Sequence, residues 1–508
     1  MPLPFLAEVA EKYVPAESYA TIFAGILAVG LIRSWAAGPS LLAREERLEA
    51  AQRRARENGK KVRVTAGLND IGARVVLIAT GAMTPLGLVT IASLAHQGAH
   101  IIALVPDISS PDVVQLLLLL RESTKSEFIY AESCDMGSLQ SITEFANRWN
   151  AGSVQATAAP GTATGMPATK APNASATGLT DDDIKAAESL LHKNTPQVHR
   201  LDTVLFLPTD ESAYKIGTPR QPTANTYPGS DKAVERTYMY EVLGRFHLVN
   251  ALLPSLLLMP PNRDVRIVSV VSPWYAAGLA EFDRVSEPLQ GPQPSVYQPW
   301  TLLGAASLRW IVLASELQRR LDLLAEADTR SRSKLPGMDV DDVTTVPVGT
   351  LKNQHKRSHI SSVIVCPGFE RSSQLTSFFG TVSPIMQHAV HSLVLWALLV
   401  VFYPLFWVFG KSASKGADAA MWGMTARLAS FVHFAPPDAN AKSLSDDQLD
   451  AARQWPGIEP ARLYREGRVV IPPVPAQLQG AENAAGLWNA TEAQVEAVLG
   501  KIARPKDS

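Results

Sequence analysis

Cysteine is nearly absent from this sequence, and neither sign of charge is in excess. Only Cys134 and Cys366 occur among 508 residues, which excludes a disulfide framework, a Cys-rich zinc site and an iron–sulfur cluster. Lys and Arg number 47 and Asp and Glu number 48, for a net charge of −1. That balance gives no support to a nucleic-acid partner bound through a basic surface. The hydrophobic fraction of 46 % does allow a sizeable core.

The ten histidines lack the spacing of a metal site. His388 and His391 lie in an uncharged stretch, and His355 and His359 lie in a basic one. Neither pair comes with the further ligands that a closed metal site requires. We therefore predict no metal centre.

The N-terminal 60 residues are predicted to form a membrane anchor and a charged stalk. The stretch 18–32 has no charged residue, and after Arg33 the sequence stays uncharged to residue 43. A helix of about 20 apolar residues spans a bilayer. Acidic residues precede this stretch and many Arg and Lys follow it. Because basic residues favour the cytosolic side of a membrane, this places the part of the protein after the anchor in the cytosol. The alternative is an amphipathic or buried N-terminal helix.

A second apolar block contains no Asp, Glu, Lys or Arg between Arg371 and Lys411. Its core is 389–410, and Pro404 would kink a helix there. We predict that this block dips into one leaflet or lies along the interface, with a full span as the alternative. The proposed interfacial anchors are Trp396, Tyr403 and Trp407. The predicted location is an endoplasmic reticulum or lipid droplet membrane, with a mitochondrial membrane as the alternative.

Apolar runs alternate with helical patterns between residues 61 and 434. This alternation predicts an α/β fold, a doubly wound parallel sheet with helices on both faces. The Ala/Thr/Pro/Gly-rich insertion at 152–197 is predicted to be disordered, and 435–508 a partly irregular tail. The predicted strands are 74–80, 100–106, 127–135, 201–207, 266–272 and 359–368.

Several short motifs occur in an order and at a spacing that resemble the short-chain dehydrogenase/reductase superfamily. They are ATGAMTPLG at 79–87, CDMGSLQSI at 134–142, RIVSVVS at 266–272 and VIVCPGFERS at 363–372. The sequence is most similar to the membrane-associated, retinol-dehydrogenase-like branch, and it also resembles a fungal family of membrane-anchored dehydrogenase-like proteins. The resemblance implies a Rossmann-like fold, an NAD or NADP cofactor and pairing into a homodimer.

The resemblance places a cofactor phosphate loop at Thr80, Gly81 and Gly87. A glycine-rich turn lets backbone N–H groups approach a pyrophosphate at a helix N-terminus. Pro85 stands where the family has its middle glycine, and proline offers no N–H. We therefore expect a weakened site.

Two acidic residues are candidates for the adenosine half of that site. Asp107 follows the second predicted strand, where a carboxylate favours NAD through a ribose hydroxyl. Asp135 matches the acidic position that the family places beside the adenine. Asp135 is equally suited to capping the helix that follows it.

This sequence departs most from the family at the catalytic positions that the resemblance implies. The family uses a Tyr, a Lys four residues later, a Ser and an Asn. Ser272 aligns with the serine, whereas Leu303 and Ser307 occupy the Tyr and Lys positions. Glu241 occupies the Asn position. Tyr275 and Tyr297 are the candidate substitutes for the missing acid.

These features predict a membrane-anchored, dehydrogenase-like protein with a degenerate active site. It would bind a dinucleotide or a lipid without ordinary turnover. One alternative is an NAD(P)-dependent oxidoreductase acting on an apolar alcohol or ketone, such as a lipid, sterol or retinoid-like compound. The other is a structural subunit of a membrane complex, so the sequence leaves enzymatic activity open.

Overall fold

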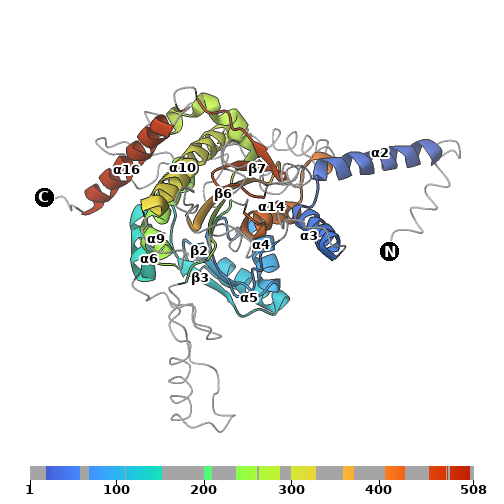
Figure 1. Cartoon of the computed structure of the whole chain (residues 1–508), viewed down its shortest axis with the longest axis horizontal. Helices are drawn as coiled ribbons and strands as arrows, with labels where there is room; N and C mark the ends of the chain where they lie inside the picture. Colours follow the sequence, from blue (N-terminus) through green and yellow to red (C-terminus); the bar gives the residue numbers. More distant parts are fainter. Residues whose placement is uncertain are drawn as a thin grey trace, which may run out of the picture.

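The computed structural model in Figure 1 gives the arrangement of most of the predicted domain. The insertion at 152–197, Tyr297 and most of the second apolar block lie outside the described residues. The residues that it describes are 19–57, 68–108, 110–150, 200–208, 236–259, 263–286, 299–327, 358–370, 407–428, 457–475, 478 and 481–503.

Eight strands form one sheet in the order β3-β2-β1-β4-β5-β6-β7-β8. Every neighbouring pair is parallel except the β7–β8 hairpin. The order reverses between β1 and β4, as in doubly wound nucleotide-binding folds. The predicted doubly wound parallel sheet is thus confirmed. The strands are β1 Val75–Thr80, β2 His100–Val105, β3 Ile129–Ser133, β4 Thr203–Phe206, β5 Val265–Val270, β6 Ile360–Cys366, β7 Leu463–Arg465 and β8 Arg468–Val470.

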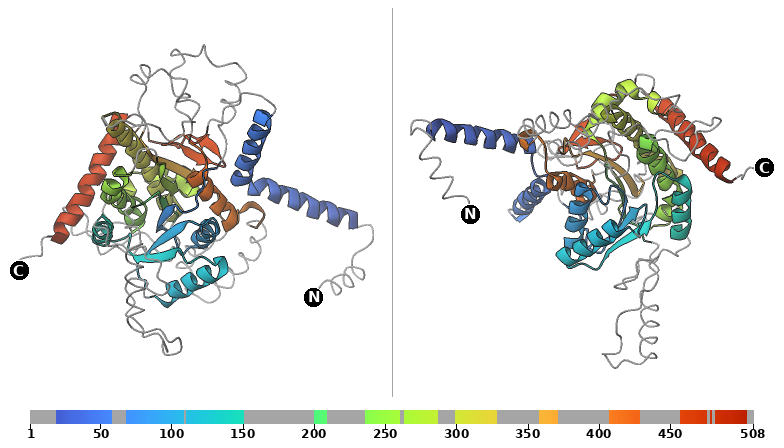
Figure 2. Two further views of the ribbon diagram at one scale, coloured as in Figure 1. Left: turned by 60° about the horizontal axis from the view of Figure 1, so that its bottom comes forward. Right: turned by 180° about the vertical axis from the view of Figure 1, so that it is seen from behind.

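The central strands are buried along their whole length because both faces of the sheet are covered. All residues of β1, β4, β5 and β6 are buried, as is typical of parallel sheets between two helical layers. One layer contains α6 Leu139–Asn150, α9 Gly244–Leu257, α10 Pro299–Ala327 and α16 Ala481–Ala503. The other contains α4 Pro85–His96, α5 Pro111–Thr124 and α14 Ala413–Thr425 (Figure 2).

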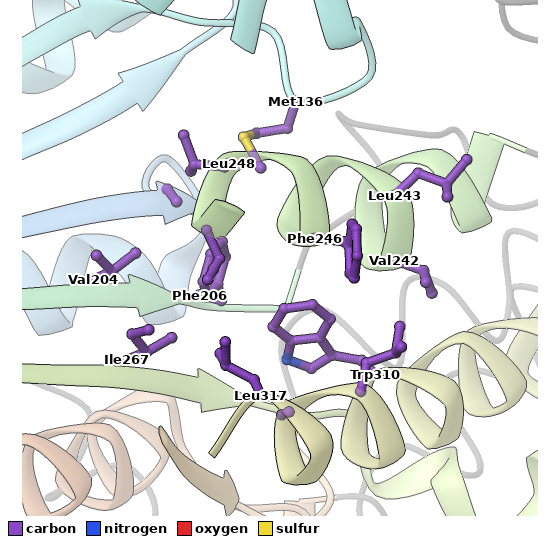
Figure 3. Packing of buried hydrophobic residues seen from close by; sticks show 14 of the residues in the cluster. Met136, Val204, Phe206, Val242, Leu243, Phe246, Leu248, Ile267, Trp310 and Leu317 are labelled. Carbon is purple, nitrogen blue, oxygen red and sulfur yellow. The ribbon is translucent and has the colours of Figure 1, made fainter. Parts of the chain in front are cut away.

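Figure 3 shows the core of the first layer, where α9 and α10 pack on β4 and β5. Trp310 of α10 lies edge-on to Phe206 of β4, with ring centroids 5.7 Å apart. Its indole Nε1 donates a hydrogen bond of 2.8 Å to Ser269 Oγ of β5. Buried Trp needs such a partner for its N–H, so this bond fixes α10 on the sheet.

The C-terminal stretch contributes to the domain rather than only following it. β7 and β8 extend the sheet beyond β6, although both lie within 435–508. Each is three residues long, too short for a visible alternation pattern. α16 then covers α9 and α10, where Trp488 packs edge-on against Phe246 at 4.6 Å.

Helix α2 (Tyr19–Ala37) projects from the body, and α3 (Leu41–Glu57) lies against α14. In the described part of the chain, no helix combines the length and apolarity needed to cross a membrane. The predicted transmembrane helix is therefore not confirmed.

Asp202 joins the amino ends of the strands. Its carboxylate is buried and accepts a 2.9 Å hydrogen bond from the Val75 N–H of β1. Arg200 donates to the same oxygen from 2.6 Å. Asp202 thus connects β1 to the residues that begin β4.

We expect Asp202→Ala to lower the free energy of unfolding by about 2 kcal/mol. The substitution leaves the buried Val75 N–H without an acceptor, which costs about 1–3 kcal/mol. Chemical denaturation followed by circular dichroism measures the loss. The control is Glu122→Ala on the exposed face of α5, which should change stability by less than about 0.5 kcal/mol. Equal stability of the two variants would contradict this role for Asp202.

Candidate functional site

The carboxyl ends of the parallel strands mark where a ligand site is expected in this topology. Gly81 follows β1, Pro208 follows β4, Ser272 follows β5 and Gly368 follows β6. The structure therefore brings the predicted phosphate loop and the predicted serine to one edge of the sheet.

The turn from β1 to α4 is closely packed against the end of β4. Gly81 has a φ of +68°, and a Cβ there would lie 2.6 Å from the Pro208 carbonyl oxygen. Thr80 Oγ1 donates a 2.6 Å hydrogen bond to the Leu207 carbonyl. A Cβ at Gly87 would overlap the Gly81 carbonyl. Both glycines are thus required by the turn itself.

Thr84 caps the N-terminus of α4. Its Oγ1 accepts a 3.0 Å hydrogen bond from the Gly87 N–H and donates to the Gly81 carbonyl at 2.7 Å. Pro85 is the first helical residue and has no N–H. Phosphate binding at a helix end relies on such N–H groups. In this turn Pro85 has no N–H, and the Gly87 N–H is already bonded to Thr84.

Asp135 is held by its own turn and by Tyr240. Its Oδ1 accepts from the Tyr240 hydroxyl at 2.7 Å and from the Gly137 N–H at 2.9 Å. The Tyr240 ring lies so close that a Cβ at Gly137 would be 2.6 Å from it. This favours the structural alternative for Asp135 that the sequence left open. Asp107 lies exposed just after β2.

Ser272 begins a 3₁₀-helical segment, η4 (Pro273–Glu281). Its buried Oγ accepts a hydrogen bond from the Trp274 N–H at 3.4 Å. Tyr275, in the first turn of η4, is also buried. Burial raises the pKa of the Tyr275 phenol, and a hydrogen bond with Arg465 opposes that rise. Tyr297 lies outside the described residues, so the structure brings together only Ser272 and Tyr275 of the three.

Segment η4 lies directly on the N-terminal half of α10. A Cβ on Gly304 would overlap the Trp274 carbonyl, and one on Gly278 would overlap the Gly304 backbone. Leu303, which the sequence resemblance assigns to the family's tyrosine position, is buried beside this contact. Ser307, one turn further, is 1 % exposed, and its Oγ has no hydrogen-bond partner within the described part of the chain.

A buried ion pair occupies the region of the predicted asparagine. Glu241 lies in a π-helical turn, η3 (Met239–Leu243), and pairs with Arg245 one turn on. The guanidinium lies 5.5 Å from the Phe206 ring centroid, and its NH2 donates to the Leu207 carbonyl at 3.4 Å. Sequence reasoning missed Arg245 and Tyr240. The Glu–Arg spacing of four residues was the one available signal for the ion pair.

Comparison with known proteins gives distant relatives. No family model matches the chain. It is 24 % identical over 403 residues to an uncharacterised oxidoreductase of Saccharomyces cerevisiae, which covers 78 % of this chain and 73 % of that protein. It is 22 % identical over 345 residues to an uncharacterised oxidoreductase of Schizosaccharomyces pombe, covering 68 % of each.

Comparison with solved structures gives, among others, a short-chain dehydrogenase from Salmonella enterica serovar Typhi. It is 13 % identical with a TM-score of 0.37, covering 79 % of this chain and 98 % of that one. Another, from Escherichia coli and complexed with NADPH, is 14 % identical with a TM-score of 0.35, covering 78 % and 99 %. The fungal relatives, together with the sheet order, confirm the predicted resemblance to dehydrogenase-like proteins.

We expect Gly304→Ala to lower the free energy of unfolding by about 1–3 kcal/mol, the range found for overpacked sites. The new methyl group would overlap the Trp274 carbonyl and force η4 away from α10. Thermal and chemical denaturation measure the change. The control is Gly486→Ala in α16, where a Cβ meets nothing within 4 Å. That variant should gain about 0.5–1 kcal/mol from helix propensity. Loss of stability in both variants, or in neither, would contradict the close contact.

We expect both thiols of the folded protein to resist alkylation at pH 8. Burial raises the pKa of Cys134 to about 12 and that of Cys366 to about 11. Because the thiolate is the nucleophile, a raised pKa leaves almost none of the reactive form at this pH. Intact-mass spectrometry after iodoacetamide treatment checks this, with protein in guanidinium as the positive control. Rapid native labelling of either thiol would show that it is not enclosed.

Proposed function

We propose that this chain is a short-chain dehydrogenase-like protein that acts through binding, without ordinary hydride transfer. The observation that carries the proposal is the pair Leu303 and Ser307 on α10, at the positions of the family's Tyr and Lys. A leucine side chain has no proton to give. General acid catalysis needs a group whose pKa is tuned near the working pH, and α10 contains no lysine to do this.

The polar groups around these positions support the same proposal. The Ser272 hydroxyl accepts from the first turn of η4, and Glu241 is paired with Arg245. Both of these groups therefore already have a structural partner.

The cofactor loop keeps its shape but fits an ordinary NAD(P) pyrophosphate poorly. The Gly87 N–H is bonded to Thr84, and Pro85 supplies none. Asp135 is bonded to Tyr240. We therefore propose weak dinucleotide binding at most, and we derive no chemical step through the cofactor.

A second candidate is an NAD(P)-dependent oxidoreductase acting on an apolar alcohol or ketone. It is favoured by the description of both fungal relatives as oxidoreductases. Tyr275 would be the substitute acid, since it lies three residues after Ser272 at the carboxyl edge. Its raised pKa keeps the phenol protonated, as a proton donor requires.

We also propose that α2 attaches the protein to a lipid bilayer, with the body on the cytosolic side. Its exposed side chains include Phe23, Ile26 and Leu31, each more than 60 % exposed. Burial of apolar area contributes about 25 cal/mol per Å², so transfer of these side chains into lipid is strongly favourable. The membrane that we propose is that of the endoplasmic reticulum or a lipid droplet, with a mitochondrial membrane as the alternative.

Calorimetric titration of NADH and NADPH into the full-length protein in mild detergent tests the proposal. We expect no binding tighter than about 100 μM, which corresponds to roughly 5.5 kcal/mol. We also expect no cofactor-dependent turnover with a panel of long-chain and sterol alcohols and ketones. Turnover that disappears in both Ser272→Ala and Tyr275→Phe, with folding retained, would overturn the proposal and establish the second candidate.

A further inference from the structure

Helix α3 is attached firmly to the body through α14. Asp418 of α14 accepts hydrogen bonds from the backbone N–H groups of Leu41, at 2.7 Å, and Leu42, at 3.3 Å. It therefore caps the N-terminus of α3 from a distant part of the chain. The Trp422 indole donates to Glu45 at 3.3 Å, and Leu41 is 3 % exposed. The segment that leads into α2 is thus held in a fixed position.

The bend between α2 and α3 lies at the carboxyl edge of the sheet. A Cβ on Gly38, in this bend, would be 3.3 Å from Glu466 Oε1 and 3.5 Å from Lys411 Nζ. These two groups form a 2.7 Å ion pair. Glu466 belongs to the turn that follows β7. We call the contact between Gly38, Leu41, Lys411, Asp418 and Glu466 the helix joint.

The helix joint also adjoins the end of β6. Gly368 follows β6 and has a φ of +92°, and a Cβ there would lie 3.1 Å from Lys411 Nζ. Arg465, at the end of β7, lies close enough to Tyr275 to oppose the rise in the pKa of its phenol. The joint therefore lies at the same edge as Ser272 and Tyr275, rather than at the amino ends of the strands.

Helix α2 presents an apolar surface around its whole circumference. Every described side chain from residue 23 to 32 is exposed, and none is charged. A helix that is apolar all round requires an apolar environment on all sides. A groove on another protein would cover only one face of it, whereas lipid covers all of them.

The described end of a second uncharged stretch contacts α2 close to the joint. The chain between Arg371 and Lys411 has no charged residue, and Trp407 near its end lies under Arg33 of α2. The guanidinium carbon is 3.4 Å from the ring centroid. Arg and Trp at the end of an apolar helix are typical of the membrane–water interface. Phe409, two residues on, is 50 % exposed.

We infer that α2 enters lipid next to the helix joint, so that the bilayer lies over the carboxyl edge of the sheet, while the buried joint residues Leu41 and Lys411 hold α2 in this position. This inference rests on the proposed membrane attachment and adds its orientation. Exposed Arg465 and Arg468 flank the joint, which suits anionic headgroups, at about 1 kcal/mol per basic residue near the surface. A ligand reaching this edge is then an amphiphile drawn from the bilayer.

Fluorophores attached to single introduced cysteines test the orientation. Phe409→Cys lies beside the joint, and Leu258→Cys lies between α9 and β5 at the amino edge, where Leu258 is 82 % exposed. The native cysteines are buried, so labelling is directed to the new sites. The full-length protein is mixed with phosphatidylcholine vesicles containing one-fifth phosphatidylserine and a spin-labelled lipid quencher. We expect at least threefold stronger quenching at residue 409 than at residue 258.

Flotation of the same samples separates the two proposals. Without flotation, the proposed membrane attachment fails. Flotation with equal quenching at both sites would overturn the orientation alone. Val469→Cys on β8, where Val469 is 48 % exposed, repeats the measurement if the variant at residue 409 does not fold.

The Asp418→Ala variant tests the helix joint itself. Loss of the cap frees α3, so flotation should persist while quenching at residue 409 falls to the value at residue 258. Asp112→Ala, in the first turn of α5, is the matched control and should leave both readings unchanged. Unchanged quenching in Asp418→Ala would show that the joint does not set the orientation.

Discussion

A parallel sheet buried on both faces is the constraint on which the rest of this structure depends. Neither face of such a sheet is exposed to water, so helices must cover both sides. The loops that connect strands and helices then lie at the two ends of the strands. Ligand sites in this topology form at the carboxyl ends. In this chain the phosphate turn, Ser272, η4 and the helix joint all meet there. What that edge can do chemically depends on which polar groups remain available.

Most of the described polar groups at that edge bond to one another. Thr84 bonds within its own turn, Asp135 bonds to Tyr240, and Glu241 pairs with Arg245. Buried polar groups need such partners because leaving one unsatisfied costs about 1–3 kcal/mol. The same bonds that stabilise the fold therefore reduce what the edge can offer to a cofactor. A fold of this kind supports many functions, and the site rather than the fold decides among them.

The direct contact between η4 and α10 has the same consequence for a substrate. Glycine at 278 and 304 lets the two backbones touch, which places the Leu303 turn of α10 under η4. Packing at close contact transmits any added volume as strain. An apolar residue at position 303 suits this buried position, whereas an ionisable one would lose hydration there. The apolar residue at position 303 and the close backbone contact between η4 and α10 thus belong to one packing arrangement.

The sequence by itself determined the strands of the central sheet and the positions of Gly81 and Gly87 in the turn after the first of them. These features are local, because a buried strand or a tight turn is recorded in neighbouring residues. Only the tertiary structure decided the partners of the polar groups. Tyr240 lies 105 residues from Asp135, and Asp418 lies 377 residues from Leu41. No periodicity records such pairs, because they form only when helices from distant parts of the chain pack on one sheet.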